Sequence, residues 1–374
     1  MALQDGVAVV TESLVKPLSS IYLQVPGGKV MNPEEIVEAY DNGERDLEPL
    51  LEKMGWTSWL GVAELGMVLG SGIVEFLSDK LTPAESKVLE LLVLRIEGKI
   101  NLESIESALE VARDPETRDL AIEGRLRMER GLVHFESGNI EGARDDLTWA
   151  ETRLKSVAKA SRDHDISLLN KAAFHLSIDE SMMALHVHGE ISRSAGHANE
   201  TIAISRIQAA RIHLAYGHIF DAARCAFNAH AHAMISKQKS LAVESGAIFV
   251  EIAAEHIVDG AVKFADQIVD AKPLSAGEEA PILQVSPEDV NGVLEWCVEN
   301  TESGFSGHER PDLRALITLA KRLDRVDLFA DLLVSHSEVE DAMLAALCAS
   351  ISDDESKAAV WKARVTEIMT LGNN

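Results

Sequence analysis

The sequence is poor in cysteine, aromatic residues and positive charge. Its 374 residues include three cysteines, 5% aromatic residues, and 35 Lys and Arg against 61 Asp and Glu, so the formal net charge is −26. Cys225, Cys297 and Cys348 lie far apart without the short spacing of a zinc site, which favours a reducing compartment. Strong acidity disfavours general binding to nucleic acid or anionic lipid, and few rings are present to stack on unpaired bases.

Signatures of nucleotide-binding and hydrolytic enzymes are also missing. The sequence contains no GxGxxG, P-loop, GxSxG or HExxH motif, and no strand-rich series typical of a nucleotide-binding fold. We therefore predict a protein that is not an enzyme and that needs no cofactor. The first residues lack the basic region, apolar run and cleavage site of a secretory signal, so we expect a cytoplasmic protein.

One apolar run, Trp59–Leu77, is long enough to need separate treatment. It holds Gly66 and Gly70 at GxxxG spacing, but also two carboxylates, Glu64 and Glu75, which are costly in hydrocarbon. We interpret the run as a buried helical hairpin. A membrane segment and an amphipathic helix that binds a partner are the alternatives.

Helical periodicity begins near Pro83 and continues to the end of the sequence. Apolar residues recur there at i, i+3, i+4 and i+7 in blocks separated by short polar breaks. Three prolines interrupt the pattern in 272–287, and 302–311 is a second break. We predict an N-terminal cap over 1–80 with a short β-hairpin at 21–31, a helical-repeat core over 81–271, a linker or long loop over 272–287, and C-terminal helical hairpins over 288–374.

A small pattern recurs four times in the central region. Its landmark is a histidine, and the four landmark histidines are separated by 41, 38 and 43 residues. A small residue stands three positions before each, a glycine or aspartate four positions after, and an alanine nine positions after. The spacing predicts a helix, a tight turn with positive φ, and a second helix packed closely on the first. The four sets are His134 with Gly131, Gly138 and Ala143; His175 with Ala172, Asp179 and Ala184; His213 with Ala210, Gly217 and Ala222; and His256 with Ala253, Gly260 and Ala265.

This skeleton of small residues, over 120–270, resembles the tetratricopeptide repeat. In that family small residues at these offsets lie where paired helices meet, and an aromatic residue usually takes the histidine position. The chain departs from the family in its longer unit, in the missing early tryptophan, and in Lys155 and Met234, which replace the closing proline. The resemblance implies an all-α fold, a right-handed superhelix of antiparallel helical hairpins with a small N-terminal cap. A generic α-solenoid of helical hairpins is the alternative description.

The resemblance also implies which residues line the concave face of the superhelix, namely those at offsets −9, −6, −2 and +1 from each landmark histidine. Fourteen of these sixteen residues are apolar, and an open apolar groove promotes association, so we expect it to be covered. A partner's helix or peptide, a second copy of the chain, Trp59–Leu77 or a C-terminal helix could cover it; alternatively, the helix phase differs and these residues form ordinary core. The predicted partner-binding residues are Arg125, Met128, Leu132, Phe135, Ile166, Leu169, Leu176, Ile204, Ile207, Arg211 and Leu214.

Histidine is abundant, and two HxH pairs invite comparison with metal sites. His186 with His188, and His230 with His232, stand two positions apart, so on a helix their side chains diverge by about 200° and cannot share one ion. We interpret the histidines as packing residues and predict no metal site. The leading hypothesis is a protein-binding scaffold or adaptor. The alternatives are a ligand-binding or metal-binding protein or enzyme that uses those four histidines inside the solenoid, a pH-responsive ladder of buried imidazoles, and a membrane-associated scaffold.

Overall fold

The computed structural model describes residues 33–54, 58–260, 262–263, 284–300, 313–329, 342–352 and 354–371. Within these ranges the regular structure is helical except for short β pairing, which confirms the predicted all-α class. The chain divides into two compact units between Ser205 and Arg206. The predicted β-hairpin at 21–31, most of the predicted linker and the second break at 302–311 lie outside the described residues.

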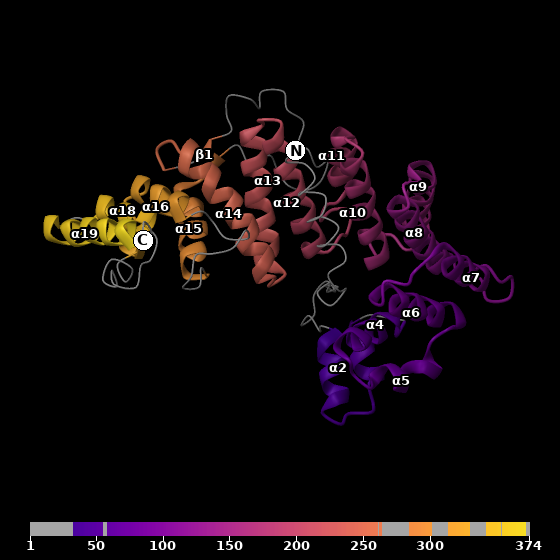
Figure 1. Ribbon diagram of the computed structural model, residues 1–374. Helices are drawn as coiled ribbons and strands as arrows, with labels where there is room; N and C mark the ends of the chain where they lie inside the picture. The colour runs from indigo at the N-terminus through magenta and orange to yellow at the C-terminus, as the bar shows by residue number, and fades with distance from the viewer. Residues whose placement is uncertain are drawn as a thin grey trace. The chain divides into compact units, whose positions relative to one another are not determined.

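The first unit is a series of helices in which neighbours along the chain pack as pairs (Figure 1). Helix α12, Asn199–Ala215, spans the division between the units. The helices before it are α2 Pro33–Asp41, α3 Glu48–Met54, α4 Leu60–Leu69, α5 Ile73–Leu77, the 3₁₀ turn η2 Ser78–Lys80, α6 Pro83–Ile96, α7 Leu102–Ala112, α8 Leu120–Glu136, α9 Ile140–Val157, α10 Arg162–Ser177 and α11 Ser181–Glu190.

The second unit continues with helices and contains the strand pair. The antiparallel strands join Val262 with Val285 and Lys263 with Gln284. The described residues of the predicted C-terminal hairpin region, 288–374, contain the helices α15, α16, α18 and α19. The elements are α13 Ile219–Ile235, α14 Lys239–His256, β1 Val262–Lys263, β2 Gln284–Val285, α15 Pro287–Asn300, α16 Leu313–Arg322, the 3₁₀ turn η4 Val326–Phe329, α18 Ala342–Ile351 and α19 Glu355–Leu371.

Helices already occur before Pro83, but a helix does start at Pro83, where the sequence predicts one, because the local sequence satisfies the free N–H groups of the first turn of α6. The Thr82 hydroxyl accepts from the Glu85 backbone N–H, and the Glu85 carboxylate accepts from the Thr82 backbone N–H at 2.8 Å. Proline at the first helical position adds a fixed φ without sacrificing a hydrogen bond.

The apolar run Trp59–Leu77 forms a helical hairpin, which confirms the prediction. Gly70 ends α4 with φ 70° and lets the chain reverse into α5. The two helices approach so closely that a Cβ on Gly66 would stand 2.3 Å from the Ile73 side chain. Both helices contribute to the hydrophobic core of the first unit. No helix in the described part of the chain combines the length and hydropathy needed to cross a bilayer.

Three of the four landmark histidines lie in the last turn of a helix, and each is followed by a turn of the same kind. The backbone carbonyls of His134, His175 and His213 each accept from the N–H five residues later, at 2.8 Å in every case. The residue four positions after each histidine has positive φ, 80° at Gly138, 62° at Asp179 and 72° at Gly217. These turns join α8 to α9, α10 to α11, and α12 to α13. The predicted helix, turn and helix are therefore present in three successive hairpins.

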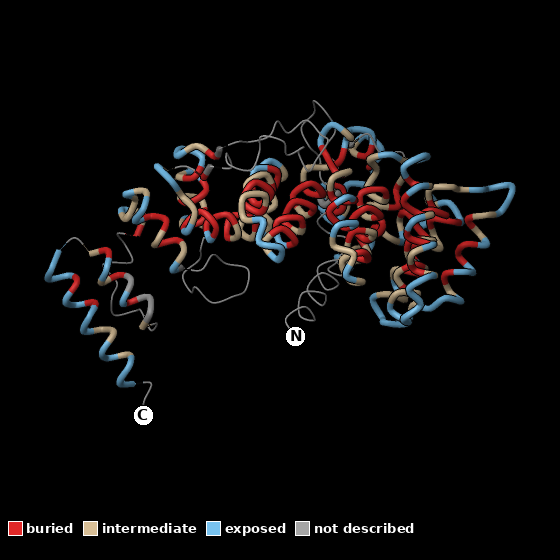
Figure 2. Tube along the Cα trace, turned by 90° about the horizontal axis from the view of Figure 1, so that it is seen from above, coloured by how far each residue is buried: buried red, intermediate tan, exposed pale blue. Residues whose placement is uncertain are grey.

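The small residues of the pattern lie where the paired helices meet. Buried residues recur along the helices of the described chain (Figure 2), and Ala143, Ala184 and Ala222 are all 0% exposed. A Cβ on Gly131 would lie 3.0 Å from Leu147 on the partner helix. Small side chains thus permit the close approach of helices that the pattern predicts.

Over the described residues the fourth recurrence does not continue into a second helix, so the prediction of a helix directly after the turn is wrong there. Helix α14 ends at His256, Ile257 is extended, and β1 follows at Val262 in place of a second helix. The reason is local: Asp259 and Gly260 both have positive φ, 50° and 76°, as in the Asp-Gly turns that lead into extended chain. Ala265 lies outside the described residues.

Candidate functional site

Helices α8 and α10 hold four half-buried apolar side chains at predicted partner-binding positions. Leu132 and Phe135 come from α8, and Ile166 and Leu176 come from α10. We call these four residues the α8–α10 row. Leu132, Phe135 and Ile166 pack against a buried cluster that fixes their inner sides while part of each remains exposed. That cluster consists of Met128, Ala143, Leu147, Ala150 and Phe174.

The remaining predicted partner-binding residues are divided between core and surface. Met128, Leu169 and Ile207 are buried, Ile204 and Leu214 are half-buried, and Arg211 is exposed. Arg211 pairs with Glu244 at 2.7 Å. The positions one residue after the landmark histidines, Phe135, Leu176 and Leu214, share the half-buried class, whereas those at the −6 offset are buried.

Arg125, also in the predicted set, faces a carboxylate from the apolar hairpin. Its guanidinium donates to the buried Glu64 of α4, and it lies 3.4 Å from Asp163 at the start of α10. Arg162 donates to the other Glu64 oxygen at 2.7 Å. The group that Arg125 contacts is thus supplied by Trp59–Leu77, and Arg125 itself is buried.

The electrostatics of this cluster keep Glu64 ionised. Burial by itself would raise the pKa of the Glu64 carboxyl, but the charges and hydrogen bonds of Arg125 and Arg162 outweigh burial and lower it. Burial would likewise lower the pKa of Arg125, yet Glu64 and Asp163 raise it. For Asp163 burial dominates, and its pKa is raised. The pair Glu64 and Arg125 is thus a charged, mutually satisfied unit inside the protein.

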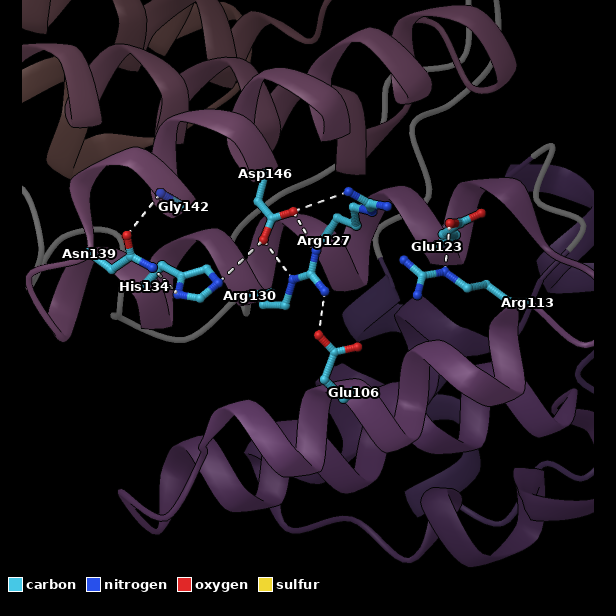
Figure 3. A network of polar contacts seen from close by, with 9 residues as sticks. All are labelled: Glu106, Arg113, Glu123, Arg127, Arg130, His134, Asn139, Gly142 and Asp146. Carbon is cyan, nitrogen blue, oxygen red and sulfur yellow. Dashed lines mark hydrogen bonds and ion pairs between the residues drawn. The ribbon is translucent and has the colours of Figure 1, made fainter.

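A polar network borders the first hairpin turn next to the α8–α10 row (Figure 3). The amide of Asn139 donates to Nδ1 of His134 at 3.1 Å, while its oxygen accepts from the Gly142 N–H at 3.0 Å. On the other side Nε2 of His134 lies 3.8 Å from Asp146, which also accepts from Arg130 at 2.6 Å. Both ring nitrogens of His134 therefore have partners, and the residue helps to hold the turn in place.

Helical geometry separates the two members of the first HxH pair, as predicted. The His186 side chain is 70% exposed, whereas His188 is buried, with its Nδ1 3.1 Å from the Ser205 hydroxyl. His230 is buried and its Nδ1 donates to the Ala242 carbonyl at 2.9 Å. His232 is also buried. Among the described residues, no histidine of either pair belongs to a group of three or more potential metal ligands.

Sequence reasoning missed a buried polar cluster at the first turn of α10. One oxygen of Asp165 accepts from Nδ1 of His197 at 2.6 Å, and the other accepts from the Thr201 hydroxyl at 2.7 Å. His164 lies beside them and its Nδ1 accepts from the Ala160 N–H at 3.0 Å. The residues are more than thirty positions apart and follow no period, so the sequence offered no signal. Both Asp165 oxygens accept hydrogen bonds, so the cluster connects α10 to the start of α12 and to the segment before it.

Comparison with known proteins adds no identification. No family model, curated protein or solved structure matches the chain. Function must therefore be argued from the residues themselves, since a helical architecture supports many activities.

Proposed function

We propose that this protein is a cytoplasmic scaffold or adaptor that binds another protein through the α8–α10 row. In this proposal the hairpins belong to a tetratricopeptide-like α-solenoid with a right-handed superhelix, and the row lies on its concave face. The bound segment is an amphipathic helix or peptide whose apolar residues contact Phe135 and Leu176.

The main support for the proposal is the matching position and exposure of Phe135 and Leu176. Phe135 and Leu176 occupy the same offset from their landmark histidines on the first helices of successive hairpins, and both keep part of an apolar side chain exposed. Equivalent positions on stacked hairpins repeat along one face, so a partner helix can meet several of them. Phe135 is further held by Phe174, whose ring meets it edge-on with 5.8 Å between centroids. A rigid aromatic anchor of this kind costs little entropy on binding.

The net charge of the chain indicates which charges the partner segment should carry. The chain carries a formal net charge of −26, so a partner segment flanked by lysine or arginine would be attracted and an acidic one repelled. We therefore expect the partner helix to have one apolar face and basic residues beside it, and its binding to weaken as ionic strength rises.

Affinity purification of the full chain with mass spectrometry tests the proposal. The test variants are Phe135→Asp and Leu176→Asp. The matched control is Met182→Asp, which changes a methionine that is 70% exposed on α11. We expect a partner that co-purifies with the wild type and the control, with recovery reduced at least about tenfold in both test variants.

A stability control separates binding from folding. Ile105→Ala removes a core residue of α7 that is 0% exposed and lies outside the cluster beneath the α8–α10 row, and should lower the free energy of unfolding by about 2–5 kcal/mol. It should still recover the partner at a temperature where it is folded. Equal recovery by the wild type and both test variants would contradict the proposal.

A further inference from the structure

The third hairpin turn gathers two imidazoles and a carboxylate. His213 lies in the last turn of α12, within the second unit, His218 precedes α13, and Asp221 lies in the first turn of α13. One ring nitrogen of each histidine and one carboxylate oxygen of Asp221 lie within 4.8 Å of one another. The two rings are 5.7 Å apart between centroids.

The buried member of this group lacks the hydrogen bonds that its counterparts make. His213 is only 4% exposed, and neither of its ring nitrogens has a hydrogen-bond partner among the described residues. A neutral imidazole carries one donor and one acceptor, so both are left unsatisfied. Burial of two such groups is unusual in a well-packed helical hairpin and indicates that the ring has a further partner.

The three turns differ in the residue that stands five positions after the landmark histidine, and this residue decides whether the ring has a hydrogen-bond partner. Five residues after the landmark histidine stand Asn139 in the first turn and Glu180 in the second. Asn139 donates to the ring of His134 at 3.1 Å, and Glu180 accepts from the ring of His175 at 2.7 Å. In the third turn the same position holds His218, whose ring lies beside His213 without a hydrogen bond between them.

The state of His213 suits a ligand. No described residue forms a hydrogen bond with either ring nitrogen of His213. A neutral imidazole has a lone pair on one ring nitrogen, and this is the form that metals bind.

We propose that His213, His218 and Asp221 bind one divalent transition-metal ion of the zinc class. Two imidazole nitrogens and one carboxylate oxygen form a common three-ligand set for zinc, in which water takes the remaining position. Nitrogen ligands favour zinc, nickel or copper over magnesium and calcium. An ion on one ring nitrogen of His213 would supply one of its missing partners.

The surroundings of the three residues allow an ion to enter and the side chains to adjust to it. His218 is exposed, so solvent reaches the group and the side chain can rotate toward an ion. In a tetrahedral site with zinc bonds of about 2.0–2.1 Å, ligand atoms lie roughly 3.3 Å apart, so the three atoms, which lie within 4.8 Å of one another, would have to move closer together. Arg224 donates to one oxygen of Asp221 at 2.8 Å and leaves the other oxygen for the ion. That contact orients the carboxylate in the manner of an outer ligand shell.

The other histidine cluster of the described chain fits a metal less well. In the group of His164, Asp165 and His197, both carboxylate oxygens and one nitrogen of each ring already make hydrogen bonds within the protein. All three residues are also buried, so an ion would have no open route from solvent. The turn at His213 has neither obstacle.

Equilibrium dialysis of the full, chelator-treated protein against ZnCl₂ tests the site. The main variant is His218→Asn, which copies the residue at the equivalent position of the first turn and therefore suits the fold. Asp221→Asn is the second variant. The matched control is His186→Asn, because the His186 side chain is 70% exposed and lies outside the group.

We expect one zinc ion per wild-type chain, with binding at least about 10-fold weaker in both variants and unchanged in the control. Replacement of zinc by cobalt should give the visible absorption of a four-coordinate or five-coordinate ion in the wild type and not in His218→Asn. Absence of stoichiometric zinc binding by the wild type, or equal affinity in the wild type and His218→Asn, would overturn the proposal.

Discussion

Glu64 and Arg125 form an ion pair inside the first unit, although 61 positions separate them in the sequence. The pair joins the apolar hairpin of α4 and α5 to the first helix of the first repeated hairpin. Both residues are at least nine-tenths buried, with exposed fractions of 1% and 5%. The segment with the strongest resemblance to a membrane helix is thus held in place by a charge that only a protein interior with a matching cation can accept.

Removal of the Glu64 charge should destabilise the protein strongly. In Glu64→Gln the guanidinium of Arg125 would remain buried and lose its hydrogen-bonded carboxylate, and loss of one partner of such a pair costs about 3–5 kcal/mol. Urea unfolding at pH 7 measures the change. The control is Glu48→Gln, whose exposed ion pair with Lys80 should contribute less than about 1 kcal/mol. Similar losses in both variants would show that Glu64 has no special role.

The second hairpin turn should give the protein a sensitivity to acid. Hydrogen bonds from Arg144, then His175, lower the pKa of Glu180 to about 2, below the value of about 4.3 expected in the unfolded chain. Because the folded pKa is the lower one, the stabilising effect is present above about pH 4.3 and disappears as the pH falls toward 2. Wild type should be more stable than Glu180→Gln at pH 6, and the difference should vanish near pH 2. A difference independent of pH would refute this assignment.

Two glycines should respond to alanine with opposite signs. A Cβ on Gly66 would lie 2.3 Å from Ile73, so Gly66→Ala should overpack the α4–α5 hairpin and cost about 1–3 kcal/mol. Gly292 lies exposed within α15 with nothing within 4 Å of its added Cβ, so Gly292→Ala should stabilise by about 0.5–1 kcal/mol. Thermal unfolding of the two variants distinguishes the effects. A loss of stability in both would show that packing at Gly66 is not the cause.

The repeated turns should tolerate asparagine but not valine. Gly138 has φ 80° and open space around an added Cβ, so the cost of substitution there comes from the backbone alone. Gly138→Val should lose about 1–2 kcal/mol, because left-handed φ is costly for branched residues. Gly138→Asn should lose less, as Asp179 already adopts φ 62° at the equivalent place. Equal stability of both variants in urea unfolding would contradict the proposed role of the turn.

More of this fold could be predicted from residues close together in the sequence than from contacts between distant ones. The start of α6, the three turns after His134, His175 and His213, and the buried alanines of the hairpins follow from nearby residues, and the structure confirms them. The fourth recurrence failed because a stronger local signal, Asp259-Gly260, turns the chain toward β1. Spacing from the landmark histidines alone could not resolve this competition.

The candidate sites depended on contacts that periodicity does not encode. The pairing of Glu64 with Arg125, and of Asp165 with His197, requires helices distant in sequence to pack at particular angles. The same limitation explains why some predicted groove residues, such as Met128, lie in the core while Phe135 keeps exposed surface. Helical phase predicts which residues share a face, but the packing of the neighbouring hairpins decides how much of that face is covered.

Hydrogen–deuterium exchange of the full chain, alone and with the partner recovered by affinity purification, tests the central claim most directly. If the α8–α10 row binds the partner, exchange should slow in the peptides of α8 and α10 that contain Phe135 and Leu176, and this protection should be lost in Phe135→Asp. Protection confined to other helices, or unchanged exchange throughout α8 and α10, would contradict the account.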